Sequence, residues 1–583
     1  MTKRMRYAAM VLALMMLLSG CRKQTATIIM EPIVEEPEWM GQSMDVAQPQ
    51  PEQQQVYQDP AIVPAPATAE EIYQAASEAA QRANPVPVSD YAPDIARGDM
   101  NIGIVMGEDA SLNPIQCTYQ DMMNLSTQVF EGLIALDENR MPIPQLADRW
   151  EVKEKEWTFT LRSGIMFHDG SYLTPDDVVA SFEAVKENPD SYWYPALDQI
   201  KGIKVVNENT VRVLSETAGY MTLYAMTFPI IQRSSMYLER PVGTGPYLIT
   251  QYSPGNAIRL EISPIWWKRA DGSVKSIVGL IYGDSAQVIA AMERMEIDTI
   301  ATEYPSASIA RSLADRTTMD YSTLTYECIV PNLRHPVLAD KAVREALMYG
   351  IDRNTLAQTI YTSMAQESEV PVIPGSGLYE PQAAQYAYNP QRALKILEDD
   401  GWQVDYSSGQ GILGKEINGK YEALKLRLFT SDRGTTSTRS EACRAIKDQL
   451  AKIGVSVTIK RMSHGDLIRA LRDQKFDLAL CAFEMGDFPN LYFLLHSNGN
   501  SNFSRYNSGE MDDYLREAYD ATTWEGLVTA MSAIQMKCVN DLPLLGLFFR
   551  TGILSSRVAL DGIVKPRRGY ALGNLAMGGG FVE

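Results

Sequence analysis

The residue whose type and position most clearly allow ligand chemistry is Asp487. It follows the mostly apolar run 477–483, which is too short for a typical helix and predicts a buried strand. Gly486, Pro489 and Asn490 around it indicate a loop. Open α/β sheets bind their ligands beyond the carboxyl ends of their strands. A carboxylate at this place is therefore a candidate ligand contact, and the alternative is an ordinary solvated loop acid.

Other kinds of chemistry find little support in the chain. The four His residues are scattered, so a His-based metal site is not expected. The six Cys residues form no CxxC pair, which argues against a zinc ribbon or a redox dithiol. Residues 409–414 match the dinucleotide spacing G-x-G-x-x-G, but they neither follow a strand nor open a helix. Asn418-Gly419 nearby predicts a hairpin-rich loop instead. We expect no cofactor, no metal and no enzymatic activity.

The bulk composition limits the class of protein. A chain of 583 residues exceeds a single hydrophobic core, so two or more domains are expected. With 45% apolar and 21% charged residues, the composition is that of a soluble globular protein. The formal net charge of −19 argues against a nucleic-acid partner, because phosphate binding needs clustered Lys and Arg.

The amino-terminal region predicts export. Lys3, Arg4 and Arg6 precede the apolar run 7–18, which is too short to span a bilayer, so residues 1–20 are interpreted as a signal peptide. The sequence Leu-Ser-Gly-Cys that ends at Cys21 resembles the bacterial lipobox. This resemblance implies cleavage before Cys21 and attachment of lipid to its thiol, whereas the alternative is a plain secretory signal.

The segment 21–97 is predicted to be a disordered tether that follows the lipidated cysteine. Residues 22–95 contain ten Pro, ten Gln, 12 acids and only 3 bases. Such a composition cannot bury enough apolar surface to form a core.

The elements that must position Asp487 lie in the second half of the chain. A strand at 424–428, a helix ended by Gly454, a strand at 455–459, a short helix and the strand 477–483 follow one another. This β-α-β-α-β order is typical of a parallel sheet covered by helices, with Asp487 beyond its third strand. The first half is richer in β-structure, with a helix predicted over 121–133. We therefore predict two lobes with a cleft between them.

Five stretches, in order, resemble the extracellular solute-binding proteins of family 5, the oligopeptide- and dipeptide-binding type. They are Leu112-Asn113-Pro114 with residues 145–150, residues 159–179, residues 243–247, residues 343–353, and residues 388–393 continuing to Gly401-Trp402. The resemblance spans roughly 100–550.

This resemblance implies an α/β fold of the type II periplasmic-binding-protein class, a two-lobed clamp or Venus flytrap with an extra β-rich subdomain in the first lobe. Lobe I is expected over 98–325, with the subdomain at about 131–240, and lobe II over 326–545. Residues 546–583 are expected to return to lobe I. The implied function is to capture short peptides outside the cell membrane and deliver them to an ABC importer.

In the family, an Asp just after a strand meets the α-amino group of the peptide, and Asp487 is the matching residue. Gly486-Asp487-Phe488-Pro489-Asn490 fits the first part of the family pattern, but Pro comes early and the second acid is missing. The aromatic residue that often precedes this Asp is replaced here by Phe483 or Met485. The predicted ligand contacts are Asn113, Tyr119, Asn332, Phe483, Met485, Gly486 and Asp487.

Two cysteines occupy regions where some relatives carry a disulfide. Cys328 and Cys481 both lie on apolar predicted strands. An exported protein meets an oxidising compartment, in which these two cysteines could form a disulfide. The alternative is two buried free thiols. Cys443 and Cys538 lie on predicted helices and are interpreted as packing residues.

Several alternatives stay open at this stage. Members of this family also take nickel, haem or oligosaccharides; the scarce His disfavour nickel, while Trp193, Trp266 and Trp267 would suit a sugar. A receptor that senses peptide without delivering it is a further alternative. A cell-surface hydrolase would need a nucleophile–base pair or metal site that the sequence does not offer. The expected partners are the permease subunits of an ABC transporter and, through the lipid, the outer face of the cytoplasmic membrane, with the protein a monomer.

Overall fold

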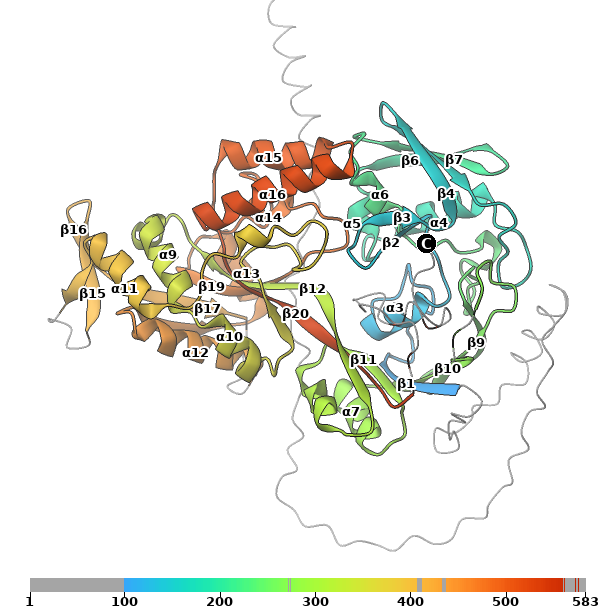
Figure 1. Cartoon of the computed structure of the whole chain (residues 1–583), viewed down its shortest axis with the longest axis horizontal. Helices are drawn as coiled ribbons and strands as arrows, with labels where there is room; N and C mark the ends of the chain where they lie inside the picture. The colour runs from blue at the N-terminus through green and yellow to red at the C-terminus, as the bar shows by residue number, and fades with distance from the viewer. Residues whose placement is uncertain are drawn as a thin grey trace, which may run out of the picture.

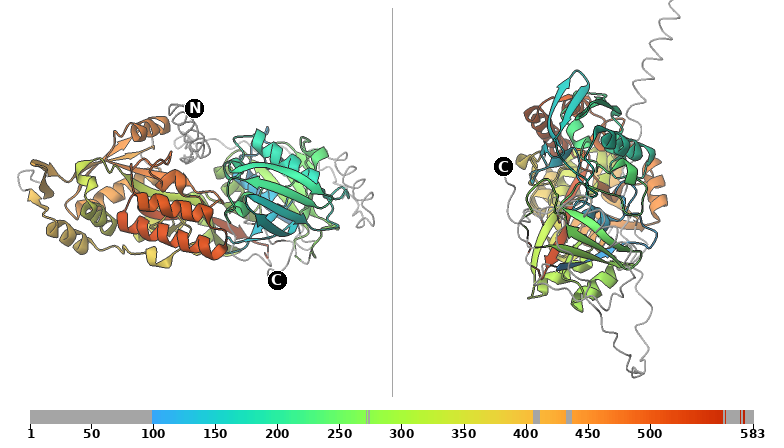
Figure 2. Two further views of the ribbon diagram at one scale, coloured as in Figure 1. Left: turned by 90° about the horizontal axis from the view of Figure 1, so that it is seen from above. Right: turned by 90° about the vertical axis from the view of Figure 1, so that its right-hand side faces the viewer.

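The computed structural model describes residues 99–270, 272, 274–405, 411–431, 437–558, 560, 572 and 575. The predicted signal peptide, Cys21 and the tether lie outside these residues, as does most of the segment after residue 558. Two lobes lie end to end along the longest axis of the molecule (Figures 1 and 2). Within the described part of the chain, no helix is both long and apolar enough to cross a membrane.

A single large sheet runs through both lobes. Its order is β18-β17-β19-β12-β20-β11-β1-β10-β9-β8, with β13 pairing off this path with β20. The strands are β1 (Asp99–Val105), β8 (Tyr247–Ser253), β9 (Ala257–Ile262), β10 (Ser276–Tyr282), β11 (Thr299–Thr302), β12 (Thr317–Pro331), β13 (Ala365–Glu367), β17 (Lys425–Thr430), β18 (Ser456–Arg461), β19 (Leu478–Glu484) and β20 (Leu545–Ser556).

Two long antiparallel strands, β12 and β20, connect the lobes. They pair with each other along most of their length. At one end β20 also pairs with β11 of the first lobe, and at the other end β12 pairs with β19 of the second lobe. The pairing of β12 with β20 shifts register between Ser322 and Tyr326. A register shift locally disrupts the ladder and bends the strand. This stretch is therefore a natural place for the two lobes to hinge.

A buried charge joins the two crossing strands near the second lobe. Glu327 of β12 is fully buried and accepts a hydrogen bond from Nε of Arg550 on β20 at 2.6 Å. Its other oxygen accepts from Tyr361 Oη at 2.9 Å. Burial acts to raise the pKa of Glu327, but Arg550 and Arg439 outweigh it, so the pKa is lowered. The carboxylate stays ionised and holds the strands together.

The second lobe confirms the predicted β-α-β-α-β order. Strand β17 is parallel to both β18 and β19, and α12 (Thr438–Ala451) and α13 (His464–Arg472) make the two crossovers. Each helix begins where a serine accepts a main-chain hydrogen bond, Ser437 from Ser440 and Ser463 from Asp466. Such caps satisfy amide groups that have no partner within the helix.

The other elements of the second lobe surround this unit. They are α8 (Pro336–Ala339), α9 (Lys341–Gly350), α10 (Arg353–Thr355), the π-helical turn η5 (Leu356–Ile360), η6 (Pro381–Ala383), α11 (Pro390–Asp399), β14 (Gln403–Asp405), β15 (Ile412–Ile417), β16 (Lys420–Ala423), α14 (Tyr492–Leu495), α15 (Gly509–Asp520) and α16 (Trp524–Asp541). Strands β14, β15 and β16 form a small sheet, and Asn418-Gly419 is its hairpin turn, as predicted. The described part of the G-x-G-x-x-G match, residues 411–414, leads into β15 and opens no helix.

The first lobe carries the additional β-rich unit. Its separate four-stranded sheet has the order β4-β5-β7-β6, next to the hairpin β2–β3. The elements of this lobe beyond the central sheet are α3 (Gln120–Ser126), β2 (Ile134–Leu136), β3 (Pro142–Pro144), β4 (Ala147–Lys153), β5 (Glu156–Leu161), α4 (Pro175–Glu187), α5 (Tyr194–Leu197), β6 (Ile200–Asn207), β7 (Thr210–Ser215), α6 (Thr222–Ala225), η3 (Arg233–Ser235), α7 (Ser285–Glu293) and η4 (Pro305–Ser312).

The helix predicted over 121–133 ends early, at Ser126. The carbonyl groups of Gln128 and Val129 accept hydrogen bonds from the amides of Tyr247 and Gly245, both at 2.9 Å. These carbonyls therefore bind a segment that is distant in the sequence, and the helix does not continue through them. A Cβ atom at Gly243 would lie 2.0 Å from the Val129 oxygen, so the glycine there permits the close approach.

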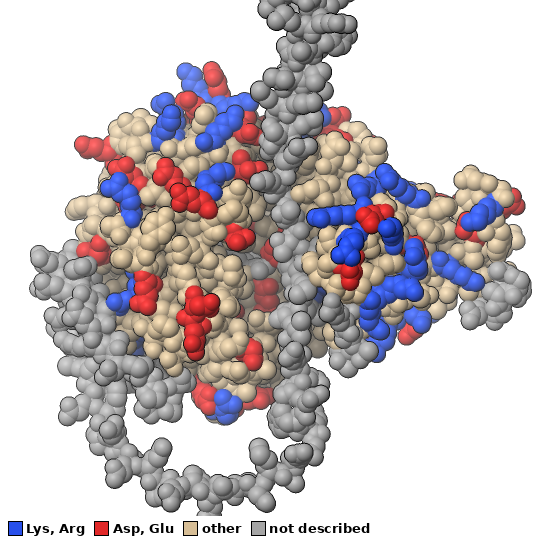
Figure 3. Space-filling view, turned by 180° about the vertical axis from the view of Figure 1, so that it is seen from behind, with Lys and Arg blue, Asp and Glu red and all other residues tan. Residues whose placement is uncertain are grey.

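Charge is unevenly distributed over this acidic protein. Seen from behind, Lys and Arg side chains gather on the second lobe (Figure 3). Exposed bases of β17, α12, β18 and α13 lie in this lobe, among them Arg427 and Arg469. Some are paired, since Arg427 contacts Asp477 at 2.7 Å and Arg469 contacts Asp466 at 2.9 Å. The bases therefore form a local basic patch on a protein whose net charge is negative.

The five cysteines of the described residues are buried free thiols: Cys117, Cys328, Cys443, Cys481 and Cys538. Cys328 and Cys481 stand opposite each other in the pairing of β12 with β19. Of the two alternatives left by the sequence, the structure has two free thiols. Burial raises the pKa of Cys481 to about 12.

We expect these thiols to resist a thiol-specific alkylating reagent in the folded protein at pH 8, because burial keeps them protonated and out of contact with solvent. In denaturant without reductant, all five should be alkylated, as read by peptide mass mapping. Alkylation of Cys328 and Cys481 only after a reductant is added would reveal a disulfide.

A buried acid joins α3 to the end of β1. Asp121, in the first turn of α3, accepts a hydrogen bond from the amide of Val105 at 2.8 Å. Burial raises the pKa of Asp121 to about 7; the hydrogen bond opposes this rise, and the charge of Glu303 adds to it. The carboxyl is therefore protonated in the folded protein at pH values where it ionises in the unfolded chain.

Asp121 should make the protein less stable as the pH rises. Between about pH 4 and pH 7 the folded state binds a proton that the unfolded state has released, so the free energy of unfolding falls. Asp121→Asn keeps an acceptor oxygen and cannot ionise. We expect its melting temperature to fall less than that of the wild type over this interval. If the melting temperatures of the two proteins change equally with pH over this interval, this interpretation is contradicted.

Candidate functional site

Asp487 lies in the loop that follows β19, at the carboxyl edge of the second-lobe sheet, as predicted. Gly486 before it has φ +67°, a left-handed conformation that favours glycine. This turn directs the chain away from the strand and toward the first lobe. The Asp487 side chain is 24% exposed.

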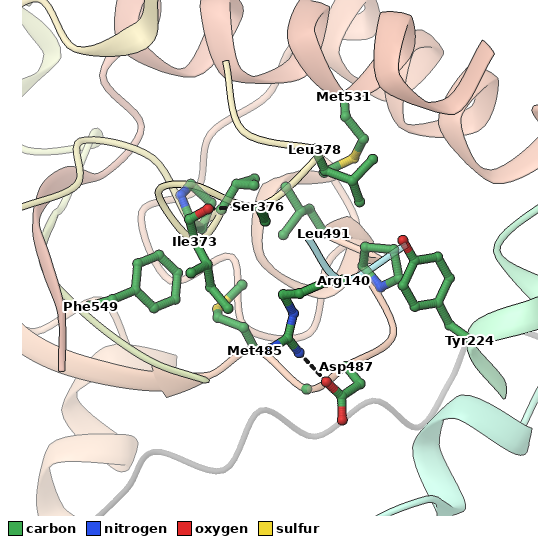
Figure 4. A pocket seen from close by; sticks show the side chains of 14 residues that line it. Arg140, Tyr224, Ile373, Ser376, Leu378, Met485, Asp487, Leu491, Met531 and Phe549 are labelled. Atoms are coloured by element: carbon green, nitrogen blue, oxygen red, sulfur yellow. Dashed lines mark hydrogen bonds and ion pairs between the residues drawn. The ribbon is translucent and has the colours of Figure 1, made fainter. Parts of the chain in front are cut away.

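Both oxygens of the Asp487 carboxylate are bound by residues of the first lobe. Arg140 donates from Nη2 to Oδ1, and Tyr192 donates from Oη to Oδ2 at 2.8 Å. These partners are 347 and 295 positions away in the chain. Figure 4 shows the Arg140 side chain reaching Asp487 beside Met485. The acid is thus part of a charged contact between the lobes.

A tight turn between β2 and β3 presents Arg140. Oδ1 of Asp137 accepts from the amides of Asn139 and Met141, both at 2.8 Å. Arg140 itself has φ 65°. The Asn139 carbonyl accepts from the amide of Gly377, in a second-lobe loop, at 2.8 Å. The turn is therefore fixed by its own acid and attached to the opposite lobe beside the ion pair.

The lobes also meet where α15 joins α16. The amide of Tyr220 donates to the carbonyl of Ala521 at 2.6 Å, and Oγ1 of Thr217 donates to Asp520 at 3.1 Å. The rings of Tyr220 and Trp524 lie 6.0 Å apart. Together with the Arg140 contact, these interactions close the seam between the lobes.

A small cavity of about 50 Å³ opens at this seam. Its lining combines the charged pair with a mostly apolar wall: Arg140, Tyr224, Pro371, Val372, Ile373, Ser376, Leu378, Met485, Gly486, Asp487, Pro489, Leu491, Met531 and Phe549. Typical ligand pockets measure roughly 300–1,000 Å³. In this arrangement the cavity accommodates the end of a ligand, and a larger ligand requires the lobes to separate.

Two polar atoms in the cavity wall have no hydrogen-bond acceptor or donor among the described residues. They are Nη1 of Arg140 and Oη of Tyr224, both buried. The Tyr224 side chain enters from the first lobe with its hydroxyl directed toward the cavity (Figure 4). Burial raises the pKa of Tyr224, so the hydroxyl stays protonated. A buried polar group without a partner is costly, and a ligand that supplies an acceptor would relieve this cost.

Three of the predicted ligand contacts, Met485, Gly486 and Asp487, line the cavity together. Phe483 does not line the cavity. It lies on β19 opposite Tyr326 of β12, and its side chain is fully buried in the hydrophobic core. The expectation that it replaces the family's aromatic residue at the ligand is corrected here.

The other three predicted contacts have structural roles away from the cavity. Nδ2 of Asn332 donates to the carbonyl of Phe476 at 2.9 Å, and Nδ2 of Asn113 donates to the carbonyl of Met236 at 2.7 Å. Tyr119 precedes α3, with its hydroxyl close to Gly107. Ligand contact by these three residues stays a prediction.

No sequence pattern pointed to Arg140, Tyr192 or Tyr224. Arg140 lies in a polar hairpin turn that is typical of a solvated surface, and nothing local shows that it faces a residue 347 positions away.

The described residues contain no group of three or more His, Cys, Asp or Glu side chains arranged to hold a metal ion. Two of the tryptophans considered for a sugar lie in the first lobe outside the cavity. Nε1 of Trp267 donates to Glu131 at 2.8 Å, and Lys268 lies over the rings of both Trp266 and Trp267. Trp193 packs edge-on against Tyr192 and so supports the Asp487 contact.

Comparison with known proteins places the chain among binding proteins. The family model described as "Bacterial extracellular solute-binding proteins, family 5 Middle" matches residues 141–505. The oligopeptide-binding protein AppA of Bacillus subtilis is 21% identical over 80% of this chain and 88% of its own length. The heme-binding protein A of Haemophilus influenzae is 24% identical over 76% of this chain and 86% of its own length.

The fold has close structural counterparts. The crystal structure of a nickel ABC transporter protein from Bacillus halodurans matches 81% of this chain and 98% of its own, with a TM-score of 0.70 and 18% identity. At this identity the likeness shows the fold, a type II periplasmic-binding-protein clamp, and not the ligand.

The contact between Arg140 and Asp487 should be measurable as a coupling energy. We expect a double-mutant cycle with Arg140→Gln and Asp487→Asn, followed by denaturant unfolding, to give about 1–3 kcal/mol, because both side chains are largely removed from solvent. The exposed pair of Lys395 and Asp399 is the control, with a coupling of about 1 kcal/mol or less. Equal coupling in the two pairs would mean that the lobes are not held together by this contact.

Proposed function

The chain belongs to family 5 of the bacterial extracellular solute-binding proteins, and from this premise we propose that it captures short peptides outside the cytoplasmic membrane and delivers them to an ABC importer. The proposal rests on the ion pair of Arg140 and Asp487. This pair lines a mostly apolar cavity between the two lobes. A peptide offers charged ends, main-chain polar groups and side chains of varied size. A charged contact beside an apolar wall is complementary to such an end.

Peptide cargo is also supported by relatives. The oligopeptide-binding protein of Bacillus subtilis aligns along most of both chains. The capture step follows from the architecture: a ligand that contacts both lobes binds the closed arrangement better than the open one and so shifts the population toward closure. The hinge is the pair of crossing strands, β12 and β20.

The anchoring of the protein is part of the proposal. Export agrees with the extracellular family, and the lipobox-like sequence supports lipid attachment at Cys21 on the outer face of the cytoplasmic membrane. The Pro- and Gln-rich segment that follows would allow a monomeric, non-enzymatic receptor to reach the permease while staying on the membrane. A receptor that reports peptide without delivering it would use the same site.

Two other cargoes are suggested by relatives and less well by the site. One structural neighbour is a nickel ABC transporter protein, but the described residues offer no cluster of metal ligands. Haem is named for another relative, and the cavity of about 50 Å³ would need a large opening to hold it. A short peptide needs only its end to enter.

Binding should be detected by a thermal-shift screen with short peptides, oligosaccharides, nickel and haem, followed by titration calorimetry. We expect peptides to raise the melting temperature, because a ligand stabilises the state that binds it. Asp487→Ala should weaken peptide affinity by about tenfold or more, since it removes one partner of a buried charge pair in the site.

Asp466→Ala is the matched control, because Asp466 is an exposed acid of α13 in the same lobe. It should bind peptide like the wild type. Stabilisation by haem or nickel alone, with no response to any peptide, would overturn peptide as the cargo.

A further inference from the structure

Each oxygen of the Asp487 carboxylate already accepts a hydrogen bond from the first lobe. Arg140 binds one of its oxygens and Tyr192 binds the other. An ammonium group that binds Asp487 in their place would displace the guanidinium, whose side chain is only 11% exposed. Leaving such a buried cation without its partner is strongly unfavourable. Replacement of Arg140 at Asp487 by a free amino group is therefore unfavourable.

The same site offers hydrogen-bond donors that are not used. Arg140 donates through Nη2 to Asp487, while its Nη1 is buried and has no acceptor among the described residues. A guanidinium group can only donate, and its planar fork matches a carboxylate. The hydroxyl of Tyr224, also buried and without a partner in the described part of the chain, lines the same cavity. The group that complements these atoms is an acceptor.

The remaining wall of the cavity is apolar. Leu378, Leu491 and Met531 come from three separate segments of the second lobe, and Phe549 adds a ring from β20. A volume of about 50 Å³ holds about four water-sized groups, which is the scale of a carboxylate and the carbons next to it.

We propose, as a refinement that rests on the proposed function, that Arg140 recognises the carboxylate end of a peptide whose last residue is apolar. Asp487 and Tyr192 are positioning residues that hold the guanidinium toward the cavity, and the apolar wall packs against the first carbons of the terminal side chain. This reverses the polarity that the family resemblance assigns to Asp487. The amino end of the peptide then lies away from the ion pair, and Asp487 does not bind it.

The test uses one peptide that binds the wild-type protein and has a carboxyl-terminal Leu or Met. It is prepared in four versions, with each end either free or blocked by acetylation or amidation. Titration calorimetry on the full chain compares the wild type with Arg140→Met and Arg140→Lys. The control is Arg149→Met, because Arg149 is an exposed arginine of the same lobe. Circular dichroism confirms that each variant is folded.

We expect amidation to weaken binding to the wild type and to Arg149→Met by about tenfold or more, because a charge-assisted hydrogen bond is lost. Acetylation should change the affinity by less than about threefold, the cost of an exposed ion pair. In Arg140→Met the effect of amidation should disappear. Arg140→Lys, which keeps the charge without the planar fork, should fall between the two.

The outcomes separate the two proposals. Loss of binding on acetylation but not on amidation would show that Asp487 reads an ammonium, which overturns this inference and leaves peptide binding intact. An effect of amidation that persists in Arg140→Met would also overturn it, since another residue would then hold the carboxylate. If none of the four versions binds, and no peptide in the screen binds, both the proposed function and this inference are overturned.

Discussion

The ion pair of Arg140 and Asp487 is the contact on which the site depends. It joins a turn of the first lobe to the loop after β19 of the second, and both side chains are largely removed from solvent. In such a place a charge is tolerated only when it is paired and hydrogen-bonded. The pair therefore links the distance between the lobes to the electrostatics of the cavity, because separating the lobes exposes both charges to water.

The rest of the fold makes this contact possible. The continuous sheet carries the second lobe on β12 and β20, and the ionised Glu327 ties these strands together on the side of that lobe. The pairing of these strands shifts register between Ser322 and Tyr326 and again between Glu327 and Cys328. We infer that the lobes hinge at these shifts. The turn at Asp137 and the left-handed Gly486 then bring the two charges to the same point.

Local patterns predicted much of the fold and little of the site. Alternating apolar residues, serine caps and Gly454 encode the β17-to-β19 unit within about sixty residues, so its order could be predicted directly. The end of α3 could not, because the groups that draw Gln128 and Val129 out of the helix lie more than a hundred positions away. Asp487 was found from its place after a strand, whereas its partners Arg140 and Tyr192 depend on the docking of one lobe on the other. The sequence predicts ligand contact for Asn113 and Asn332, and in the structure each side chain donates to a main-chain carbonyl.

The most direct test of peptide recognition by this ion pair is a crystal structure of the protein with a short peptide bound. We expect the peptide at the seam between the lobes, with its terminal carboxylate within hydrogen-bond distance of Arg140 and with Asp487 still bound to the same guanidinium. A peptide whose ammonium occupies Asp487 while Arg140 is displaced would contradict this, as would a peptide bound away from this cavity.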